Sequence, residues 1–328
     1  MSAAATTSPA KLMRAIVVEE FGGPEVLRMR EMPAPAAREG LIPVEVLAAG
    51  INYADTHQAE NSYHTPATLP LIPGAEVVAR APHGERIVAL LPAGGGYAER
   101  ALVSEALSVP VPEGVEDAQA LAAILQGLTA WHLLRTSARM EPGESVVVHA
   151  AAGGVGTLAL QLAKRWGAGR VIAVASSEEK RSLALELGAD VAIDSRGELR
   201  RTIEDAAGGR VDIVLEMVGG RTFDESLRAL APFGRLISYG IASREMPKPV
   251  DVVALNRHST GVLGFWLAHC VGSPEMFKTP ARELLELIRS GELRAIVGGT
   301  YPLAEAQRAH EDLRARRTTG KLVLDPRA

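Results

Sequence analysis

A short run of small residues between positions 151 and 156 has the composition of a phosphate-binding turn. Ala151, Gly153 and Gly156 fit the pattern A-x-G-x-x-G, in which alanine replaces the first glycine of the dinucleotide-binding fingerprint. The run follows Val146–Val148, a β-branched stretch typical of a buried parallel strand. It precedes apolar residues spaced i, i+3, i+4 and i+7 between Val155 and Trp166, which indicate a helix with one buried face. With a further strand at 171–174, these residues predict a βαβ unit.

The chemistry of this turn follows from its missing side chains. A helix that begins directly after a strand points its unpaired N–H groups and the positive end of its dipole at the turn. Without Cβ atoms at Gly153 and Gly154, a pyrophosphate can approach the backbone, and Gly156 lets the helix pack tightly on the strand. The alternative is a small-residue turn that only packs two elements together. The flanking strand and helix favour a cofactor site made of Gly153, Gly154, Val155 and Gly156.

The tip of the second strand bears on the choice between NADPH and NADH. NAD-specific folds place an acid there to accept hydrogen bonds from the ribose hydroxyls. This strand ends at Ser176 and Ser177, whose hydroxyls can donate to a 2′-phosphate, and Lys180 lies one helical turn further on. Glu178 and Glu179 bring negative charge nearby, but both should point away if Ser177 caps the helix. We therefore predict NADPH as the cofactor.

The segments on either side of this unit differ in character. Up to about residue 117, short strands alternate with turn signals, which predicts a compact, mostly β domain. Beyond residue 175, the pattern predicts helices at 182–187, 199–206 and 223–230 and strands at 191–194, 211–215 and 235–240. This alternation indicates an α/β fold with a doubly wound parallel sheet. The tail predicts helices at 281–289 and 303–316 and a last strand at 321–324.

Composition narrows the class of protein. The chain has 328 residues, 47% of them apolar and 23% charged, as in a soluble protein of two domains. The net charge of -4 gives no general affinity for nucleic acid, and no apolar run reaches the roughly 18 residues that span a membrane. Residues 1–11 predict a tail without the apolar core of a signal peptide. The single cysteine, Cys270, rules out an internal disulfide and favours a cytoplasmic protein.

Several stretches together resemble the medium-chain dehydrogenase/reductases, and within them the zinc-free quinone oxidoreductases related to zeta-crystallin. The stretches are AAGINYAD (48–55), LPLIPGAE (69–76), QGLTAWHLL (126–134), VHAAAGGVG (148–156), LELGAD (185–190) and RRTTGKLVL (316–324). The resemblance implies a Rossmann cofactor domain at 126–265. It would be inserted in a β-rich, GroES-like catalytic domain formed by 1–125 and 266–328, with the active site in the cleft between them.

The resemblance also raises the question of zinc. At the positions where zinc alcohol dehydrogenases of this superfamily hold catalytic zinc, the chain has Asn52, Ala75 before Glu76, and Leu125. Asparagine, alanine and leucine cannot form a tetrahedral site of nitrogen and sulfur ligands, so we expect no metal. Alcohol oxidation is then disfavoured, because an alkoxide needs a Lewis acid. A quinone or an activated alkene can accept hydride with hydrogen-bond help alone.

The resemblance places candidate catalytic residues near Asn52. The Asn52 amide can donate to a substrate oxygen or to the cofactor; the alternative is a turn residue at a strand end. Tyr63 matches a tyrosine over the substrate pocket, either as a hydrogen-bond or proton donor or, as we favour, as an aromatic wall. His57 is expected to contact the cofactor, with a surface histidine as the alternative. Asp55 is expected to cap a turn.

The remaining cofactor contacts are also implied by the resemblance. Thr129 would lie near the nicotinamide ribose. Arg317 and Lys321 would approach the 2′-phosphate, or else belong to a solvated helix end. The chain departs from its relatives at Asp194, where many have a tyrosine or histidine that stacks on the adenine end. The residues expected to flank the nicotinamide are Ser238, Tyr239, Gly240, Ile241, Gly264, Phe265 and Trp266.

These observations predict an NADPH-dependent oxidoreductase that reduces quinones or related α,β-unsaturated carbonyls by hydride transfer without zinc. Two alternatives remain: an enoyl or alkenal double-bond reductase, and an NADPH-binding protein with a structural or RNA-binding role. The net charge disfavours RNA. The apolar stretch 260–267 at the end of the parallel sheet predicts a two-fold homodimer. We expect a small-molecule substrate and neither nucleic acid nor membrane as a partner.

Overall fold

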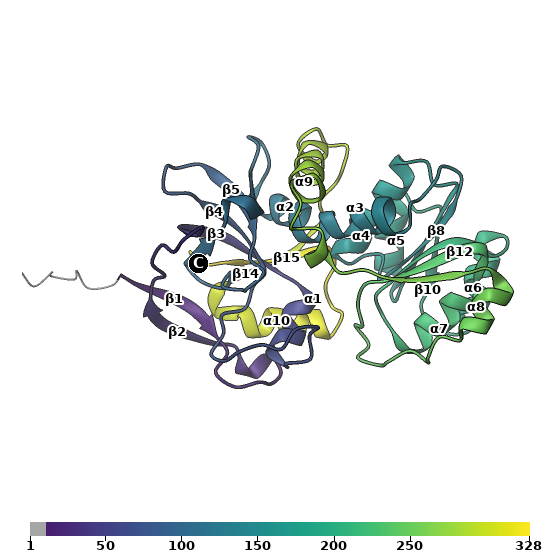
Figure 1. The fold of residues 1–328 in the computed structure, drawn as a ribbon, viewed down its shortest axis with the longest axis horizontal. Coiled ribbons are helices and arrows are strands. Elements are labelled where there is room, and N and C mark those ends of the chain that lie inside the picture. Colours follow the sequence, from purple (N-terminus) through teal and green to yellow (C-terminus); the bar gives the residue numbers. More distant parts are fainter. Residues whose placement is uncertain (1–10) are drawn as a thin grey trace, which may run out of the picture. The chain divides into compact units, whose positions relative to one another are not determined.

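The computed structural model describes residues 11–328, which fall into two compact units. The N-terminal unit comprises the chain up to Val111 together with Gly299–Arg317 and Leu322–Ala328. The central unit comprises Pro112–Gly298 and Thr318–Lys321. The C-terminus therefore returns to the unit in which the chain starts, as Figure 1 shows by its colours. Residues 1–10 of the predicted tail lie outside the described residues.

A seven-stranded sheet forms the framework of the N-terminal unit. Its strand order is β14-β15-β3-β4-β5-β7, with β6 paired to β3. The central strand β3 runs antiparallel to β4, β6 and β15. The bounds are β3 Ile42–Ile51, β4 Glu76–Arg80, β5 Arg86–Leu90, β6 Arg100–Val103, β7 Ser108–Pro110, β14 Val297–Pro302 and β15 Lys321–Asp325.

Smaller elements complete this unit. Strands β1 (Leu12–Val17) and β2 (Arg28–Pro33) form a separate antiparallel pair. One apolar core joins distant parts of the chain, with Ile16, Val46, Tyr97 and Leu322 among its buried members. The helices are α1 (Tyr53–Ala59) and α10 (Ala306–Arg314), with short 3-10 turns η1 (Pro24–Val26), η2 (Glu105–Leu107) and η6 (Leu303–Glu305).

The central unit contains the parallel sheet that the sequence predicted. Its order is β10-β9-β8-β11-β12-β13, and each neighbouring pair runs parallel. The chain moves outward from β8 to β10 and then returns to the other side of β8, so the direction of winding reverses between β8 and β11. Ligands of such sheets bind outside the carboxyl ends of the strands at this switch point. The bounds are β8 Ser145–His149, β9 Arg170–Ala175, β10 Val191–Asp194, β11 Val211–Glu216, β12 Leu230–Ser238 and β13 Gly261–Gly264.

Helices connect and cover these strands (Figure 1). Helices α6 and α7 pack on each other and on the sheet, where Ile203 and Phe223 join the apolar core. Helix α4 packs on β8, β9 and α3. The bounds are α2 Asp117–Leu121, α3 Leu128–His132, α4 Gly154–Arg165, α5 Glu178–Glu186, α6 Leu199–Ala207, α7 Gly220–Arg228, α8 Val252–His258 and α9 Pro274–Arg289, with π-helical turns η3 (Ala122–Gly127) and η4 (Leu133–Ser137) and the 3-10 turn η5 (Leu267–His269).

The boundaries of the two units differ from those drawn at 125/126 and 265/266 from the sequence. The central unit begins at Pro112 and continues to Gly298. The reason lies in the helices, because α9 packs on η3 and α3, and these in turn pack on α4. Residues on both sides of the parallel-sheet segment therefore belong to its unit.

Across residues 11–328, no helix combines the length and the apolar character that crossing a bilayer requires.

Candidate functional site

The turn between β8 and α4 is the tight turn that the glycine pattern predicts. Gly153 caps α4, and its N–H donates to the Ala150 carbonyl at 2.8 Å. A Cβ atom on Gly156 would lie 2.7 Å from Cα of Ala151 and overlap the Ala150 carbonyl. Gly156 is therefore required for the close packing of helix on strand, in agreement with the role expected for it.

Gly154 has a neighbour that the sequence did not suggest. Its missing side chain is replaced by the amide of Gln126, because a Cβ atom there would overlap that amide group. Gln126 comes from η3, 28 positions earlier in the chain. The N–H groups of Gly154, Val155 and Gly156 form the first turn of α4 and so have no acceptor within the helix. Such donors, at a positive helix end, suit a pyrophosphate.

The C-terminal segment Thr318–Lys321 lies against this turn. The Gly320 N–H donates to the Ala152 carbonyl at 2.8 Å, and Gly320 pairs with Gly153 in a parallel bridge. Lys321 follows directly and is fully buried. Arg317 instead forms an ion pair with Asp312 at 2.6 Å and belongs to the N-terminal unit. The structure thus brings Lys321, but not Arg317, into the same unit as the glycine turn.

The tip of β9 has the arrangement expected for helix capping. The Ser177 hydroxyl accepts the Lys180 N–H at 3.3 Å and caps α5, which confirms the predicted cap. Glu178 and Glu179 lie exposed in the first helical turn. Ser176 is exposed and Lys180 is half-buried. The two residues directly after β9 therefore carry hydroxyls and no acid.

Asp194 occupies the end of β10, in register with Ala175 at the end of β9. Its carboxylate binds Arg196 at 2.7 Å and Arg181 at 3.1 Å. The hydrogen bond from Arg196, above all, lowers the pKa of Asp194. Arg181 also donates to the Ala175 carbonyl at 3.3 Å. Asp194 and the two arginines therefore form an ion-pair cluster that holds a guanidinium group at the tip of β9.

The loops after β11, β12 and β13 meet at one edge of the sheet. The Phe265 N–H donates to the Ser238 carbonyl and the Tyr239 N–H to the Glu216 carbonyl, both at 2.9 Å. Gly264 and Trp266 flank Phe265, and Gly240 and Ile241 follow Tyr239. These residues, all expected around the nicotinamide, lie at the carboxyl ends of β12 and β13 or on the loops that follow them, as the fold class requires. Thr129 lies on α3 and donates to the Leu125 carbonyl at 2.8 Å.

Glu216 is a buried acid at this edge that the sequence analysis missed. Its Oε1 accepts the N–H groups of Val218 at 2.7 Å and Gly219 at 3.0 Å. Its Oε2 has no hydrogen-bond partner among residues 11–328. Burial raises the pKa of Glu216 to about 7, against the lowering effect of the two N–H groups. Burial and the nearby Glu216 charge also raise the pKa of Tyr239.

In the N-terminal unit, Asn52 lies between β3 and α1 and is almost fully buried. Its N–H donates to Asp55 Oδ2 at 2.8 Å, and its Nδ2 donates to Glu76 Oε1 at 2.7 Å. Asp55 Oδ2 also accepts the Tyr97 hydroxyl at 2.9 Å, and that hydroxyl oxygen lies 3.1 Å from His310 Nε2. Asp55 thus caps the turn, as expected. Asn52 caps the start of α1 and its side-chain amide donates to a buried carboxylate, so the structure fits both a turn residue and a hydrogen-bond donor at this position.

His57 and Tyr63 lie further along the same segment. His57 is 7% exposed, so it is not a surface histidine, and its Nδ1 lies 2.8 Å from the Ser62 hydroxyl. Tyr63 is half-buried in the loop after α1, and its ring centre lies 5.0 Å from that of His64. The structure therefore places both residues on the segment that follows Asn52 and includes α1.

A catalytic zinc does not fit the donors present. No three side chains of His, Cys, Asp or Glu within residues 11–328 form a group that could hold a metal ion. Asn52 and Glu76 bind each other, and Ala75 and Leu125 have no donor atoms in their side chains.

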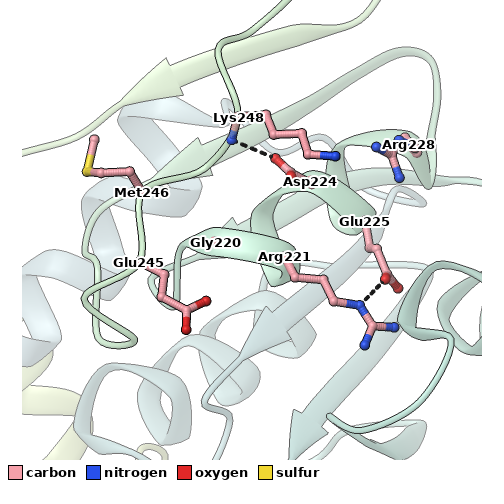
Figure 2. Close-up of a pocket in the computed structure, with 8 residues that line it drawn as sticks. All are labelled: Gly220, Arg221, Asp224, Glu225, Arg228, Glu245, Met246 and Lys248. Atoms are coloured by element: carbon pink, nitrogen blue, oxygen red, sulfur yellow. Dashed lines mark hydrogen bonds and ion pairs between the residues drawn. The ribbon is translucent and has the colours of Figure 1, made fainter.

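A surface hollow of about 430 Å³ lies apart from these residues, between α7 and the loop after β12 (Figure 2). Arg221 binds Glu225 there, and the Lys248 N–H donates to Asp224 at 3.1 Å. None of the sequence-predicted site residues lines it. The full lining is Gly220, Arg221, Asp224, Glu225, Arg228, Glu245, Met246 and Lys248. Because charges of both signs face open solvent here, we assign it no function.

Known proteins resemble the chain over nearly its whole length. Residues 154–287 match the family described as "Zinc-binding dehydrogenase". The quinone oxidoreductase of Pseudomonas aeruginosa is 37% identical over 320 residues, which cover 93% of this chain and 97% of that protein.

Two solved structures have the same fold. The quinone oxidoreductase of Escherichia coli, solved in complex with NADPH, has a TM-score of 0.89 and 33% identity and covers 95% of this chain and 100% of that one. That of Thermus thermophilus, also solved in complex with NADPH, has a TM-score of 0.86 and 39% identity over the same shares. With its parallel-sheet unit, its glycine turn and this similarity, the chain belongs to the quinone oxidoreductases, enzymes of the medium-chain dehydrogenase/reductase superfamily.

Proposed function

We propose that this chain reduces quinones by hydride transfer from NADPH, without zinc. The observation that carries the proposal is the switch point of the central sheet. There the glycine turn offers helix N–H groups, and the residues directly after β9, Ser176 and Ser177, carry hydroxyls and no acid. The Arg181 guanidinium group lies at the same strand tip, paired with Asp194 of β10. The relatives solved with NADPH support the same cofactor.

The residues of the central unit bind and orient the cofactor in this proposal. The N–H groups of Gly154, Val155 and Gly156 hold the pyrophosphate, and the α4 dipole favours its charge. Ser176 and Ser177 donate to the 2′-phosphate, and Lys180 supplies a positive charge. Thr129 and the loops 238–241 and 264–266 flank the nicotinamide. Bound NADPH supplies the hydride.

The N-terminal unit acts on the acceptor. The Asn52 amide donates a hydrogen bond to the acceptor oxygen or to the cofactor, which stabilises negative charge that develops on that oxygen as hydride arrives. Tyr63 forms an aromatic wall for a planar acceptor. His57 and Lys321 stay predicted cofactor contacts, and the Asp312 ion pair makes Arg317 the weakest of them. The absence of zinc ligands at Asn52, Ala75 and Leu125 supports hydride transfer without a Lewis acid.

A side-by-side assay tests the proposal. NADPH oxidation is followed with 9,10-phenanthrenequinone, 1,4-benzoquinone and a 2-alkenal at matched concentrations. We expect the highest kcat/KM with a quinone. A higher value with the alkenal would instead make the chain a double-bond reductase. NADPH binding without turnover of any acceptor would point to a non-enzymatic role.

The proposal also covers the oligomeric state of the protein and its location in the cell. Strand β13 is the last strand of the parallel sheet, and the side chain of Leu263 on it is exposed. An open edge of this kind is usually paired, so we propose a two-fold homodimer through residues 260–267. Cytoplasmic location is proposed from the single cysteine, and Cys270 is buried. The acceptor is a small molecule, and no nucleic-acid or membrane partner is proposed.

A further inference from the structure

The carboxylate of Glu76 is buried in the middle of the N-terminal sheet. Glu76 begins β4 and has no exposed surface, and the strand continues with the fully buried Val77, Val78 and Ala79. A charge in such surroundings is costly unless hydrogen bonds compensate it. Its place therefore calls for a specific partner.

Gly50 makes the room for this carboxylate. The register of β3 and β4 pairs Ala49 with Val77, so that Gly50 lies beside Glu76. A Cβ atom on Gly50 would lie 2.6 Å from Cγ and 2.7 Å from Cδ of Glu76 and would overlap its Oε1. The Gly50 φ angle is not positive, so the glycine is required here by the neighbouring carboxylate and not by backbone conformation.

One partner of the carboxylate is the amide of Asn52. Glu76 Oε1 accepts from Asn52 Nδ2 at 2.7 Å. The Asn52 backbone is held separately in the capping box of α1, where its carbonyl accepts the Asp55 N–H at 3.0 Å and its N–H donates to Asp55 Oδ2 at 2.8 Å. The contact with Glu76 fixes the amide in one orientation, because the flipped amide would set its oxygen against a carboxylate oxygen. The nitrogen of Asn52 is thereby kept as the donor.

We infer that Glu76 is a positioning residue, which orients the Asn52 amide for hydrogen-bond donation to the acceptor or cofactor, and that Gly50 leaves the space this contact needs. The inference rests on the proposed role of Asn52. In this inference the buried carboxylate of Glu76 has the function of holding an amide.

A double-mutant cycle tests this inference. Asn52→Ala, Glu76→Ala and the double variant are compared by steady-state kinetics with NADPH and the best quinone. Since a displaced catalytic group can cost up to about 100-fold, we expect each single variant to lower the same kinetic parameter about 10- to 100-fold. The double variant should lose no more than Asn52→Ala alone, because the two residues act as one unit.

Two further variants separate positioning from folding. Gly50→Ala displaces the carboxylate while leaving Glu76 in place, and we expect the same loss of activity. Glu76→Gln keeps an acceptor oxygen of the same reach and should retain activity within about threefold of wild type. Gly272→Ala, where a Cβ atom meets open space, is the matched control and should leave activity unchanged.

The outcomes distinguish this inference from the proposed function. If Asn52→Ala leaves turnover unchanged, the proposed role of Asn52 fails and the inference falls with it. If Asn52→Ala is impaired but the losses of Asn52→Ala and Glu76→Ala multiply in the double variant, Glu76 acts independently and only the inference is overturned. Should Glu76→Ala not fold, the comparison of Gly50→Ala with Glu76→Gln decides, and full activity of Gly50→Ala overturns the inference.

Discussion

The substitution Glu216→Gln should remove a pH dependence from the stability of the central unit. Glu216 ends β11, is fully buried, and has one carboxyl oxygen on the N–H groups of Val218 and Gly219. Glutamine has the same shape and can offer its carbonyl oxygen to both N–H groups. The substitution therefore removes the ionisation of the side chain and keeps the turn after β11.

The magnitude follows from the raised pKa of Glu216. A carboxyl whose pKa is about 7 in the folded protein and 4.5 when unfolded is stabilising in its protonated form. This contribution is complete below pH 4.5 and is lost as the pH rises to about 7. A difference of this size corresponds to roughly 3 kcal/mol in total, of which about 2 kcal/mol is lost between pH 5.5 and 8.5.

Tryptophan fluorescence in urea provides the assay. All three tryptophans, Trp131, Trp166 and Trp266, belong to the central unit, so the signal reports its unfolding. The free energy of unfolding of Glu216→Gln minus that of wild type should rise by about 2 kcal/mol from pH 5.5 to 8.5. His149 in the same unit, whose pKa burial lowers to about 4, affects both proteins and cancels in the difference.

The matched control is Glu113→Gln, a change at an exposed glutamate of the same unit. Its difference from wild type should not vary with pH. If Glu216→Gln also shows a difference that is independent of pH, Glu216 ionises normally in the folded protein, and the reasoning from burial is refuted.

Three further predictions concern the proposed function. Lys180→Ala should raise the KM for NADPH about 10- to 100-fold, since a charge-assisted phosphate contact contributes roughly 1.5–3 kcal/mol, and should leave the KM for NADH nearly unchanged; an equal effect on both cofactors would contradict this phosphate site. Metal analysis of the purified protein should find no stoichiometric zinc, and chelators should not change activity; about one zinc per chain would overturn the zinc-free reaction. Light scattering at micromolar concentration should give the mass of a dimer, and Leu263→Asp, a charge at the open sheet edge, should give a monomer; a monomeric wild type would refute the proposed interface.

The central sheet was readable from the sequence because its strands are continuous apolar runs bounded by glycine and polar residues. The strand expected at 191–194 is β10, and that expected at 211–215 is β11 with one more residue. Helix starts were less accurate. Helix α5 begins at Glu178, four residues before the expected start, because its first turn is polar and is stabilised by the Ser177 cap. Helix α8, whose Val252 and Val253 are exposed, has no apolar face to reveal it.

Helix α9 begins seven residues before the predicted start. The predicted helix began at residue 281, directly after Pro280, and a proline inside a helix removes a hydrogen bond. The helix instead begins at Pro274 and contains Pro280. Pro280 has no N–H to donate to the Met276 carbonyl four residues earlier. That carbonyl instead accepts a hydrogen bond from His132 Nε2 at 2.7 Å. A residue 144 positions away thus satisfies the group that the proline leaves unpaired.

In the candidate site, too, contacts between residues far apart in the sequence could not be predicted. The glycine turn, the Ser177 cap and Asp55 were predictable, because each depends on residues within a few positions of one another. The contact of Arg181 with Asp194 was not, since only the pairing of β10 with β9 brings Asp194 to the strand tip. Such contacts join segments that a pattern of spacing cannot connect.

Three glycines illustrate the difference between contacts that are local in the sequence and contacts that are not. Gly156 is required by Ala150 and Ala151, five or six positions before it, and the fingerprint encodes that requirement. Gly154, which looks like part of the same fingerprint, makes room in the structure for the amide of Gln126, and Gly50 makes room for the carboxylate of Glu76. Each of these three glycines marks a close approach, and the sequence alone does not say whether a phosphate, a backbone group or a polar side chain approaches. Where the approaching group is a side chain, the glycine and its partner act as a pair, and the function of either has to be tested in the presence and absence of the other.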